Sequence, residues 1–454
     1  MRKYGAQLSL LSMILLLSGC SNTTEAGQTA PSDTVSQGSA VTEASENAAE
    51  SAVTEESAAE EAAKTLQPRS TEHEYVHGEE GYYNILEDGI DFELVGQGSG
   101  TCWVCASACA LMTDYQRDHE DKINLDQYVL LDAIYDPDKP EDAEGLFVSK
   151  GMNTHSYGGA RIFVINELSR KSVDGLVLDT AIAVQEDWSM EEIKDGLRQY
   201  GALYIGIPDT DRSKKGYHDN YYTMNYPDAE ESAYDHSIAV LGWDDHFPKE
   251  YFNTEASQDG AWITYNSLYT QGYYYVSYDT VFDFFGDFPC FLSASKDYTK
   301  VLAYDGGYWG MPVNGTGEAT TLANVFSEKG TLAAVGTYVL ADDTDLTIQV
   351  LTPDLEECLY SQEVHVDRMG YYVFDLEDPM EVDEYAIAVT YPGEAPVEGE
   401  SMELDPVLRV QSHSEEGQSY LLQEDGTWLD LGSEAAREKT GFETNNACIR
   451  ALYR

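Results

Sequence analysis

The sequence predicts an α+β domain, with a helical half and a β-rich half, followed by an all-β sandwich domain. Two segments support the first domain: an apolar run over 103–116 that suits a helix, and a helix-then-strand pattern over 189–207. The third observation is a change near residue 300, after which apolar and polar residues alternate as they do in half-buried strands. We therefore divide the folded chain into residues 73–298 and residues 299–454.

The helix-then-strand pattern has recognisable start and stop signals. Ser189 and Glu192 have the spacing of a capping box. Met190, Ile193, Leu197 and Tyr200 then share one side of the predicted helix. Gly201 can end this helix, because glycine is favoured just after a helix C-terminus. The apolar residues 202–207 follow and predict a buried strand.

The second domain is predicted from short alternating segments. Leu346, Ile348 and Val350 alternate with polar residues, and the segment 385–389 repeats the pattern. Asp425-Gly426 is a hairpin turn signal. Short strands separated by turns indicate a β-sandwich.

The N-terminus predicts export. Arg2 and Lys3 precede an apolar run over 8–17, which fits a signal peptide and is too short for an ordinary membrane span. Leu17-Ser18-Gly19-Cys20 resembles the bacterial lipobox, in which the cysteine is lipidated and becomes the mature N-terminus. We expect residues 1–20 to be a lipoprotein signal peptide, lipidated at Cys20, that anchors the chain at the extracellular face of the bacterial cell membrane. The alternative is an ordinary signal peptide in which Cys20 is incidental.

Residues 21–72 are predicted to be a disordered acidic tether. The segment 21–70 has no Phe, Trp or Tyr and is rich in Ala, Ser, Thr and Glu, so it cannot bury enough apolar surface to offset the entropy of ordering. An inhibitory pro-segment is the alternative, but such segments fold. The formal net charge of the chain is -56, which would repel phosphate polymers, so we expect no nucleic-acid partner.

The segment Gln97-Gly98-Ser99-Gly100-Thr101-Cys102-Trp103 carries the strongest functional signal. Cys102 follows a glycine-rich turn and opens the predicted helix over 103–116. The N–H groups and the dipole at a helix N-terminus favour a thiolate, which is the nucleophile of acyl-transfer chemistry. Gln97, five residues earlier, can donate a hydrogen bond to an oxyanion.

Two polar residues downstream can complete this chemistry. His236 stands at the head of the alternating segment 236–243, 134 residues after Cys102. Asn266 ends the strand-like run 262–266, 164 residues after Cys102. A histidine and an asparagine roughly 130–150 residues after a cysteine are typical of cathepsin-type enzymes, so His236 fits this spacing and Asn266 falls slightly beyond it.

With these three motifs in order, residues 90–280 resemble the papain-like cysteine peptidases of the exported bacterial type. The resemblance implies that Cys102 is the nucleophile and that His236 is the general base and then the acid. It further implies that Asn266 holds the imidazole by a hydrogen bond from its side-chain amide. Gln97 and the Cys102 N–H would form the oxyanion hole.

The resemblance also implies a substrate site and marks two departures. Gly158-Gly159 is similar to the family's glycine pair that binds an extended substrate backbone, where a side chain would block close approach. The turn between Gln97 and Cys102 is one residue shorter than is usual in the family. Leu268 stands where the family commonly has a tryptophan. No cofactor and no metal are implied.

The C-terminal domain is similar to the lectin-like module attached to some of these peptidases, around residues 323–338, 417–431 and 446–452. The resemblance implies a surface-anchored peptidase that hydrolyses extracellular peptides or proteins through a thioester acyl-enzyme, with a glycan as a further candidate partner of the lectin-like domain. The competing hypothesis is a catalytically weak surface protein that binds peptide or glycan.

The three cysteines at the start of the helix allow two interpretations. Cys102, Cys105 and Cys109 form a C-x2-C-x3-C pattern that could hold an iron–sulfur cluster. On one helix they share a stripe, which favours a nucleophile followed by two small buried thiols. Cys290, Cys358 and Cys448 are scattered, and no disulfide can be assigned among them.

Overall fold

The structure is a computed structural model that describes most of the chain after residue 80. The described residues are 81–90, 96–98, 100–119, 122–136, 138–140, 143–149, 151–209, 215–218, 221–228, 234–268, 272–284, 286–306, 309–404, 406–443 and 445–454. The predicted signal peptide, Cys20 and the predicted tether therefore lie outside the described residues. Within the described part, no helix is both long enough and apolar enough to span a membrane.

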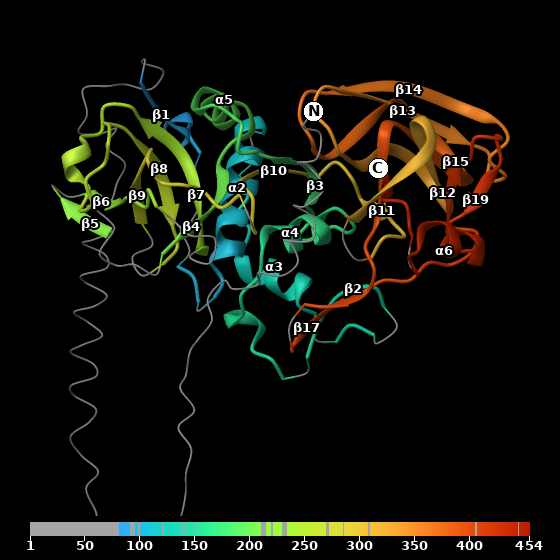
Figure 1. Cartoon of the computed structure of the whole chain (residues 1–454), viewed down its shortest axis with the longest axis horizontal. Helices are drawn as coiled ribbons and strands as arrows, with labels where there is room; N and C mark the ends of the chain where they lie inside the picture. Colours follow the sequence, from blue (N-terminus) through green and yellow to red (C-terminus); the bar gives the residue numbers. More distant parts are fainter. Residues whose placement is uncertain are drawn as a thin grey trace, which may run out of the picture.

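The first part of the chain contains four α-helices among the described residues, together with a set of mostly short strands (Figure 1). The helices are α2 (Cys102–Asp118), α3 (Gln127–Ile134), α4 (Arg161–Leu168) and α5 (Met190–Tyr200). The short 3-10 helices are η3 (Ile85–Asp88), η4 (Thr154–Ser156) and η7 (Lys249–Tyr251). The strands are β1 (Tyr82–Asn84), β2 (Gly145–Val148), β3 (Val177–Ala183), β4 (Leu203–Pro208), β5 (Lys215–His218), β6 (Tyr221–Met224), β7 (Tyr234–Asp244), β8 (Ala261–Asn266), β9 (Gly272–Ser277) and β10 (Cys290–Ser295).

The helix-then-strand pattern predicted from the sequence is confirmed. In α5, the Ser189 hydroxyl accepts from the Glu192 N–H, and the Glu192 carboxylate accepts from the Ser189 N–H. Gly201 follows α5 with φ 82°, a backbone conformation that favours glycine. Strand β4 then begins at Leu203 and is buried throughout.

Strand β7 lies at the centre of the β-rich half. It pairs antiparallel with β4, β8 and β1, and Ile205 lies opposite Ile238 in the β4–β7 ladder. Figure 1 shows α2 running beside β7 and β4. Consecutive residues of β4, β7 and β8 are buried, so both faces of this sheet are covered and neither faces water.

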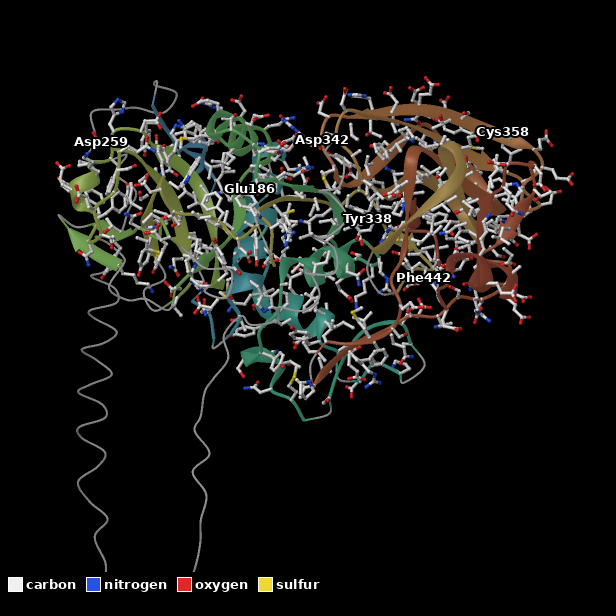
Figure 2. The ribbon with its side chains drawn as sticks, in the orientation of Figure 1. Glu186, Asp259, Tyr338, Asp342, Cys358 and Phe442 are labelled. Carbon is white, nitrogen blue, oxygen red and sulfur yellow. The ribbon has the colours of Figure 1, made fainter. Side chains whose placement is uncertain are left out.

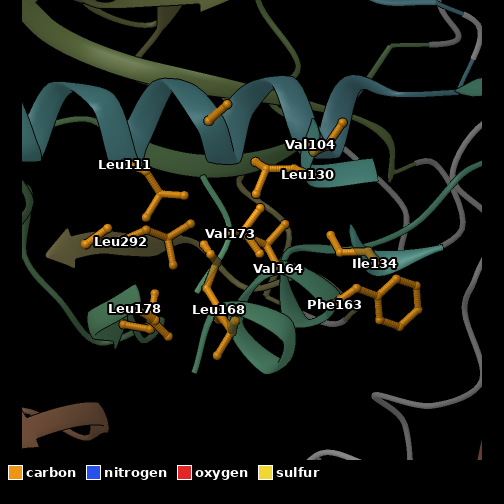
Figure 3. Close-up of a cluster of buried hydrophobic side chains, with 14 of the residues drawn as sticks. Val104, Leu111, Leu130, Ile134, Phe163, Val164, Leu168, Val173, Leu178 and Leu292 are labelled. Atoms are coloured by element: carbon orange, nitrogen blue, oxygen red, sulfur yellow. The ribbon is translucent and has the colours of Figure 1, made fainter. Parts of the chain in front are cut away.

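Helices α2, α3 and α4 pack around a common apolar core, which lies below α2 in Figure 3. Val104 and Leu111 of α2 are fully buried in it, and Leu292 of β10 closes one side. Residues from the other elements complete the cluster: Leu130 and Ile134 of α3, Phe163, Val164 and Leu168 of α4, Val173, and Leu178 of β3. This core fixes α2, and with it the position of the helix N-terminus that carries Cys102.

The second part is dominated by strands, as predicted. The strands are β11 (Lys300–Leu302), β12 (Trp309–Val339), β13 (Thr344–Leu351), β14 (Cys358–Val366), β15 (Gly370–Glu398), β16 (Met402–Glu403), β17 (Leu408–Gln411), β18 (Ser419–Leu422), β19 (Trp428–Asp430) and β20 (Ile449–Tyr453). The long strands β12 and β15 pair antiparallel over most of their length. Their inward side chains, such as Leu322, Ile387 and Val389, form a separate buried core with those of β13 and β20.

The second part is not purely β, which corrects the all-β prediction. A short helix, α6 (Glu434–Thr440), follows β19. Ser433 caps its N-terminus by accepting from the Ala436 N–H, and Gly441 ends it with φ 79°. These are ordinary helix start and stop signals, and their capping bonds satisfy backbone groups at the helix ends.

Strand pairing and a shared core join the two parts. Strand β3 pairs with β10 on one side and with β15 on the other, and β2 pairs with β17 in a small separate sheet (Figure 1). Tyr338, Tyr371, Leu408, Val410 and Cys448 from the second part lie in the same apolar core as α2 and α4. Figure 2 places Tyr338 at this junction and Cys358 at the far end of the second part.

A buried ion pair lies beside this junction. Arg450 donates to Asp305 at 2.5 Å, and both side chains have no exposed surface. The Arg450 guanidinium lies 5.0 Å from the ring of Tyr338 and 5.2 Å from that of Tyr371. Removing either partner would leave an uncompensated buried charge. Because Asp305 and Arg450 lie near the two ends of the second part, the ion pair forms only when that part is complete.

We therefore predict that a chain truncated at residue 298 does not fold, although the sequence pattern alone indicates a separable module. Removing the second part leaves β2 without its partner strand and exposes one edge of β3. It also removes Tyr371, Leu408 and Val410 from the shared core. The measurement is the soluble yield and the cooperativity of thermal unfolding of the truncated chain. A soluble monomer with a single cooperative transition would contradict the prediction.

Candidate active site

Cys102 is the first residue of α2 and is 4 % exposed. The preceding Gly100 has φ +76°, and a Cβ there would lie 2.9 Å from the Ser156 carbonyl oxygen. Glycine is therefore required for the close approach of this turn to the segment before Gly158. The Thr101 hydroxyl donates to the Gly98 carbonyl and makes no capping bond to the first turn of the helix.

His236 and Asn266 are brought together at neighbouring strands. His236 lies near the start of β7, and Asn266 is the last residue of β8. The Nε2 atom of His236 lies 2.9 Å from Oδ1 of Asn266, and both side chains are buried. The β7–β8 pairing fixes this contact, because the two residues lie toward the same end of the hairpin.

The hydrogen bonds of Asn266 determine which nitrogen of His236 carries a proton. The Leu268 N–H donates to Asn266 Oδ1 at 2.9 Å, so this atom is the carbonyl oxygen and an acceptor. His236 Nε2–H must then be the donor, and Nδ1 is left to accept a proton. This corrects the expected direction: the imidazole donates to Asn266, and the side-chain amide N–H does not donate to the imidazole.

Burial lowers the pKa of His236, whereas Asp209 and the hydrogen bond to Asn266 favour its protonated form. Burial therefore favours a neutral imidazole that can accept a proton. Asp209 and Asn266 stabilise the imidazolium once it has formed. Such opposing influences on one pKa are typical of a general base that also acts as an acid.

Gln97 is held by Ser267, the residue after Asn266. The Gln97 N–H donates to the Ser267 carbonyl oxygen at 3.0 Å, and the Ser267 hydroxyl donates to Gln97 Oε1 at 2.8 Å. Because Oε1 is the acceptor in this pair, the side-chain NH₂ of Gln97 is directed elsewhere. Sequence reasoning missed Ser267, since a lone serine after an asparagine has no distinctive signal.

The glycine pair lies beside the nucleophile turn. A Cβ on Gly100 would lie 3.2 Å from the Gly158 N atom. The Tyr135 hydroxyl donates to the Gly158 carbonyl at 2.6 Å, and a Cβ on Gly159 would lie 2.5 Å from the Trp103 ring. Packing against Trp103 therefore requires glycine at 159, independently of any substrate.

Further contacts place the start of α2 next to the ends of β7 and β8. Burial raises the pKa of the Cys105 thiol, one turn after Cys102, and the nearby Ser267 side chain acts in the opposite direction. On the other side, Tyr204 lies close enough to Cys102 for the thiolate charge to contribute, after burial and Asp287, to raising the Tyr204 pKa. Tyr204 also lies 2.7 Å from Ser237, which follows His236. The predicted nucleophile, base and asparagine thus converge on one region.

Apart from Cys102 and Cys358, the cysteines of the described residues are buried and placed for packing. The Cys105 thiol donates to Gln127 Oε1 at 2.7 Å, and burial raises its pKa to about 12. Burial also raises the pKa of Cys109. The six cysteines of the described residues are free thiols, and only Cys358 among them is exposed. No group of three or more His, Cys, Asp or Glu side chains in that part of the chain could hold a metal ion.

Comparison with known proteins bears on both parts of the chain. Residues 303–453 match the model of the lectin-like domain family, which confirms the resemblance found in the sequence. Among curated proteins, none matches this sequence.

Two solved structures of Cwp84 have the same overall fold. The clostridial cysteine protease Cwp84 after propeptide cleavage superposes with a TM-score of 0.64 at 17% identity, over 82% of this chain and 98% of that one. The cysteine protease and lectin-like domains of Cwp84, a surface layer associated protein of Clostridium difficile, superpose with a TM-score of 0.64 at 17% identity, over 83% and 89%. This chain therefore has the two-domain fold of a cysteine protease joined to a lectin-like domain.

Proposed function

We propose that the protein is a papain-like cysteine peptidase, with a two-lobed catalytic domain over residues 73–298 and a lectin-like sandwich over 299–454. The observation that carries the proposal is the hydrogen-bonded set His236–Asn266 and Ser267–Gln97, located next to the helix N-terminus that bears Cys102. A nucleophile, a base oriented by a third group and an oxyanion donor are the parts that acyl transfer needs.

The geometry suggests a role for each group. His236 Nδ1 accepts the thiol proton, and the thiolate of Cys102 attacks the substrate carbonyl to form a tetrahedral oxyanion. This intermediate becomes a thioester when its C–N bond breaks. The NH₂ of Gln97 and the Cys102 N–H stabilise the oxyanion. Hydrogen bonds to an oxyanion stabilise it most where water is excluded. His236 then returns the proton to the leaving amine and later activates water. Gly158-Gly159 binds the substrate backbone in an extended pose.

The test is cleavage of an unbiased peptide library by the purified protein, with products identified by mass spectrometry. We expect peptide bonds to be cut, and the activity to be lost after treatment with a thiol-directed epoxide. The competing function is a surface protein that only binds peptide or glycan. A homogeneous protein that cuts no peptide in the library would favour that alternative.

We also propose that the protein acts outside the cell, attached to the membrane by a lipid on Cys20. The lipobox-like Leu17-Ser18-Gly19-Cys20 and the surface-layer association of Cwp84 support this location. Changing Cys20→Ser should release the protein into the medium, because no lipid could then be attached. Fractionation of producing cells measures this, and a variant that stays in the membrane fraction would contradict the lipid anchor.

A further inference from the structure

A chain of buried polar side chains runs beside the candidate active site from α4 to β7. Arg161, the first residue of α4, donates to Asp287 at 2.5 Å. The Tyr204 hydroxyl donates to the other oxygen of the same carboxylate. Ser237 Oγ lies 2.7 Å from the Tyr204 hydroxyl. Because that hydroxyl has one proton and gives it to Asp287, Ser237 is the donor to Tyr204.

The two ends of this chain lie next to residues of the proposed catalytic site. Ser237 directly follows His236 in β7. Arg161 comes two residues after Gly159 and opens the helix that follows the glycine pair. The two ends belong to different halves of the first domain, the β-rich half and the helical half. The polar chain thus connects the proposed base to the proposed substrate-binding segment.

Tyr204 and Arg161 are well buried and the Asp287 side chain is 17% exposed, so solvent weakens their bonds only partly. Tyr204 has no exposed surface, and the Arg161 side chain is 7% exposed. Arg161 also lies 5.9 Å from the Phe288 ring. Asp287 is fixed by its own loop, because its N–H and that of Gly286 both donate to Asp283 at 2.9 Å. Bonds to a charged group in such a site are stronger than neutral ones.

We infer that Asp287 and Tyr204 are positioning residues for peptide binding: they hold the Gly158-Gly159 segment at a fixed place relative to the strand that carries His236. This inference rests on the proposed peptidase function. The hydrogen bonds of these four side chains lead to the start of α4 and to Ser237, and burial keeps Tyr204 neutral beside Cys102 by raising the Tyr204 pKa. Loss of these bonds should therefore impair peptide binding much more than the reactivity of Cys102 toward a small reagent.

Two thiol reagents separate these effects in the full-length protein. Iodoacetamide has no peptide backbone and reports on Cys102 and His236 alone, whereas a peptidyl epoxide must also bind the glycine segment. For Tyr204→Phe and for Asp287→Asn, we expect the peptidyl epoxide to react about tenfold more slowly. The iodoacetamide rate at Cys102 should change by less than about twofold. Since the residues act as a unit, the double variant should lose little more than either single variant.

Tyr298→Phe is the matched control. Tyr298 is a buried tyrosine whose hydroxyl donates to Asp375 at 3.0 Å, away from the proposed site. The control removes another tyrosine–carboxylate bond, although the Asp375 side chain is 60% exposed against 17% for Asp287, and both alkylation rates should stay at the wild-type value. If Tyr204→Phe does not fold, Ser237→Ala is used instead. It removes the hydrogen bond between Ser237 and Tyr204, and the same two alkylation rates are measured.

Two outcomes would overturn the inference: equal losses with both reagents, or no greater loss with the peptidyl epoxide than in Tyr298→Phe. The proposed function is judged separately, by whether the wild-type protein cleaves peptides. A wild-type protein that cleaves no peptide, but whose epoxide labelling still depends selectively on Tyr204, would refute the peptidase and support the positioning role.

Discussion

Replacing Cys102 with alanine is expected to abolish peptide hydrolysis, with a loss on the order of 10⁵–10⁶-fold in kcat if the wild-type enzyme is efficient. No other group at the site can form the thioester, and water activated by His236 alone is a poor substitute. Steady-state kinetics on the best peptide from the library screen measures the effect.

Cys105→Ala is the control for this prediction. Cys105 lies one turn further along α2, and its thiol donates to Gln127 with a pKa raised to about 12 by burial. We expect its replacement to change kcat by only a few fold, through packing. Hydrolysis that survives in Cys102→Ala, or that is lost equally in Cys105→Ala, would remove Cys102 from the proposed role.

Gln97→Ala is expected to lower kcat by roughly 10²–10³-fold, which is typical for the loss of one oxyanion donor. Ser267 binds Oε1 of Gln97 at 2.8 Å and so directs the amide NH₂ away from itself. KM should change little, because the oxyanion forms only after attack. The measurement is kcat and KM for the same peptide.

Ser267→Ala serves as the companion variant. It keeps the Gln97 amide but removes the hydroxyl that orients it, so we expect a smaller loss in kcat than in Gln97→Ala. The backbone bond from the Gln97 N–H to Ser267 remains in both variants. An increase in KM with unchanged kcat in Gln97→Ala would mean that this side chain binds substrate rather than the oxyanion.

Local signals in the sequence predicted the elements well. The capping box of Ser189 and Glu192 and the glycine at 201 defined α5, because caps depend on residues within one turn. The change near residue 300 predicted the strand-rich second part, because the alternation of apolar and polar residues in a strand is also a local pattern. Helix α6 was missed although Ser433 and Gly441 carry the same kind of signal. The helix has only seven residues, which is too short to show an apolar stripe.

Contacts between distant segments could not be predicted in this way. The β2–β17 pairing joins strands more than 250 residues apart, and the bond from Arg161 to Asp287 spans 126 positions. Neither has a periodic pattern that would mark it. The site motifs all precede residue 298, which predicts separable parts, whereas the core that joins the parts is built from residues such as Tyr371 that look like ordinary strand residues.

The candidate site lies between these two cases. Cys102, His236 and Asn266 could be proposed from motifs and their order, because each stands at the end of a helix or strand that has its own signal. The direction of the His236–Asn266 bond depended on the Leu268 N–H, which only the folded chain reveals. Ser267, Tyr204 and Asp287 contact the site through the fold and have no motif of their own.

The pH dependence of alkylation tests most directly whether Cys102 is an activated nucleophile. Iodoacetamide is applied to the full-length protein between pH 5 and pH 9, and the rate at each cysteine is followed by mass spectrometry. Cys358 is the internal reference, because it is exposed and far from the proposed site. Cys102 should react faster than Cys358 below roughly pH 8.5, where an ordinary thiol is mostly protonated. His236→Ala should remove this advantage, whereas a Cys102 that reacts no faster than Cys358 at any pH would contradict the proposed thiol–imidazole pair.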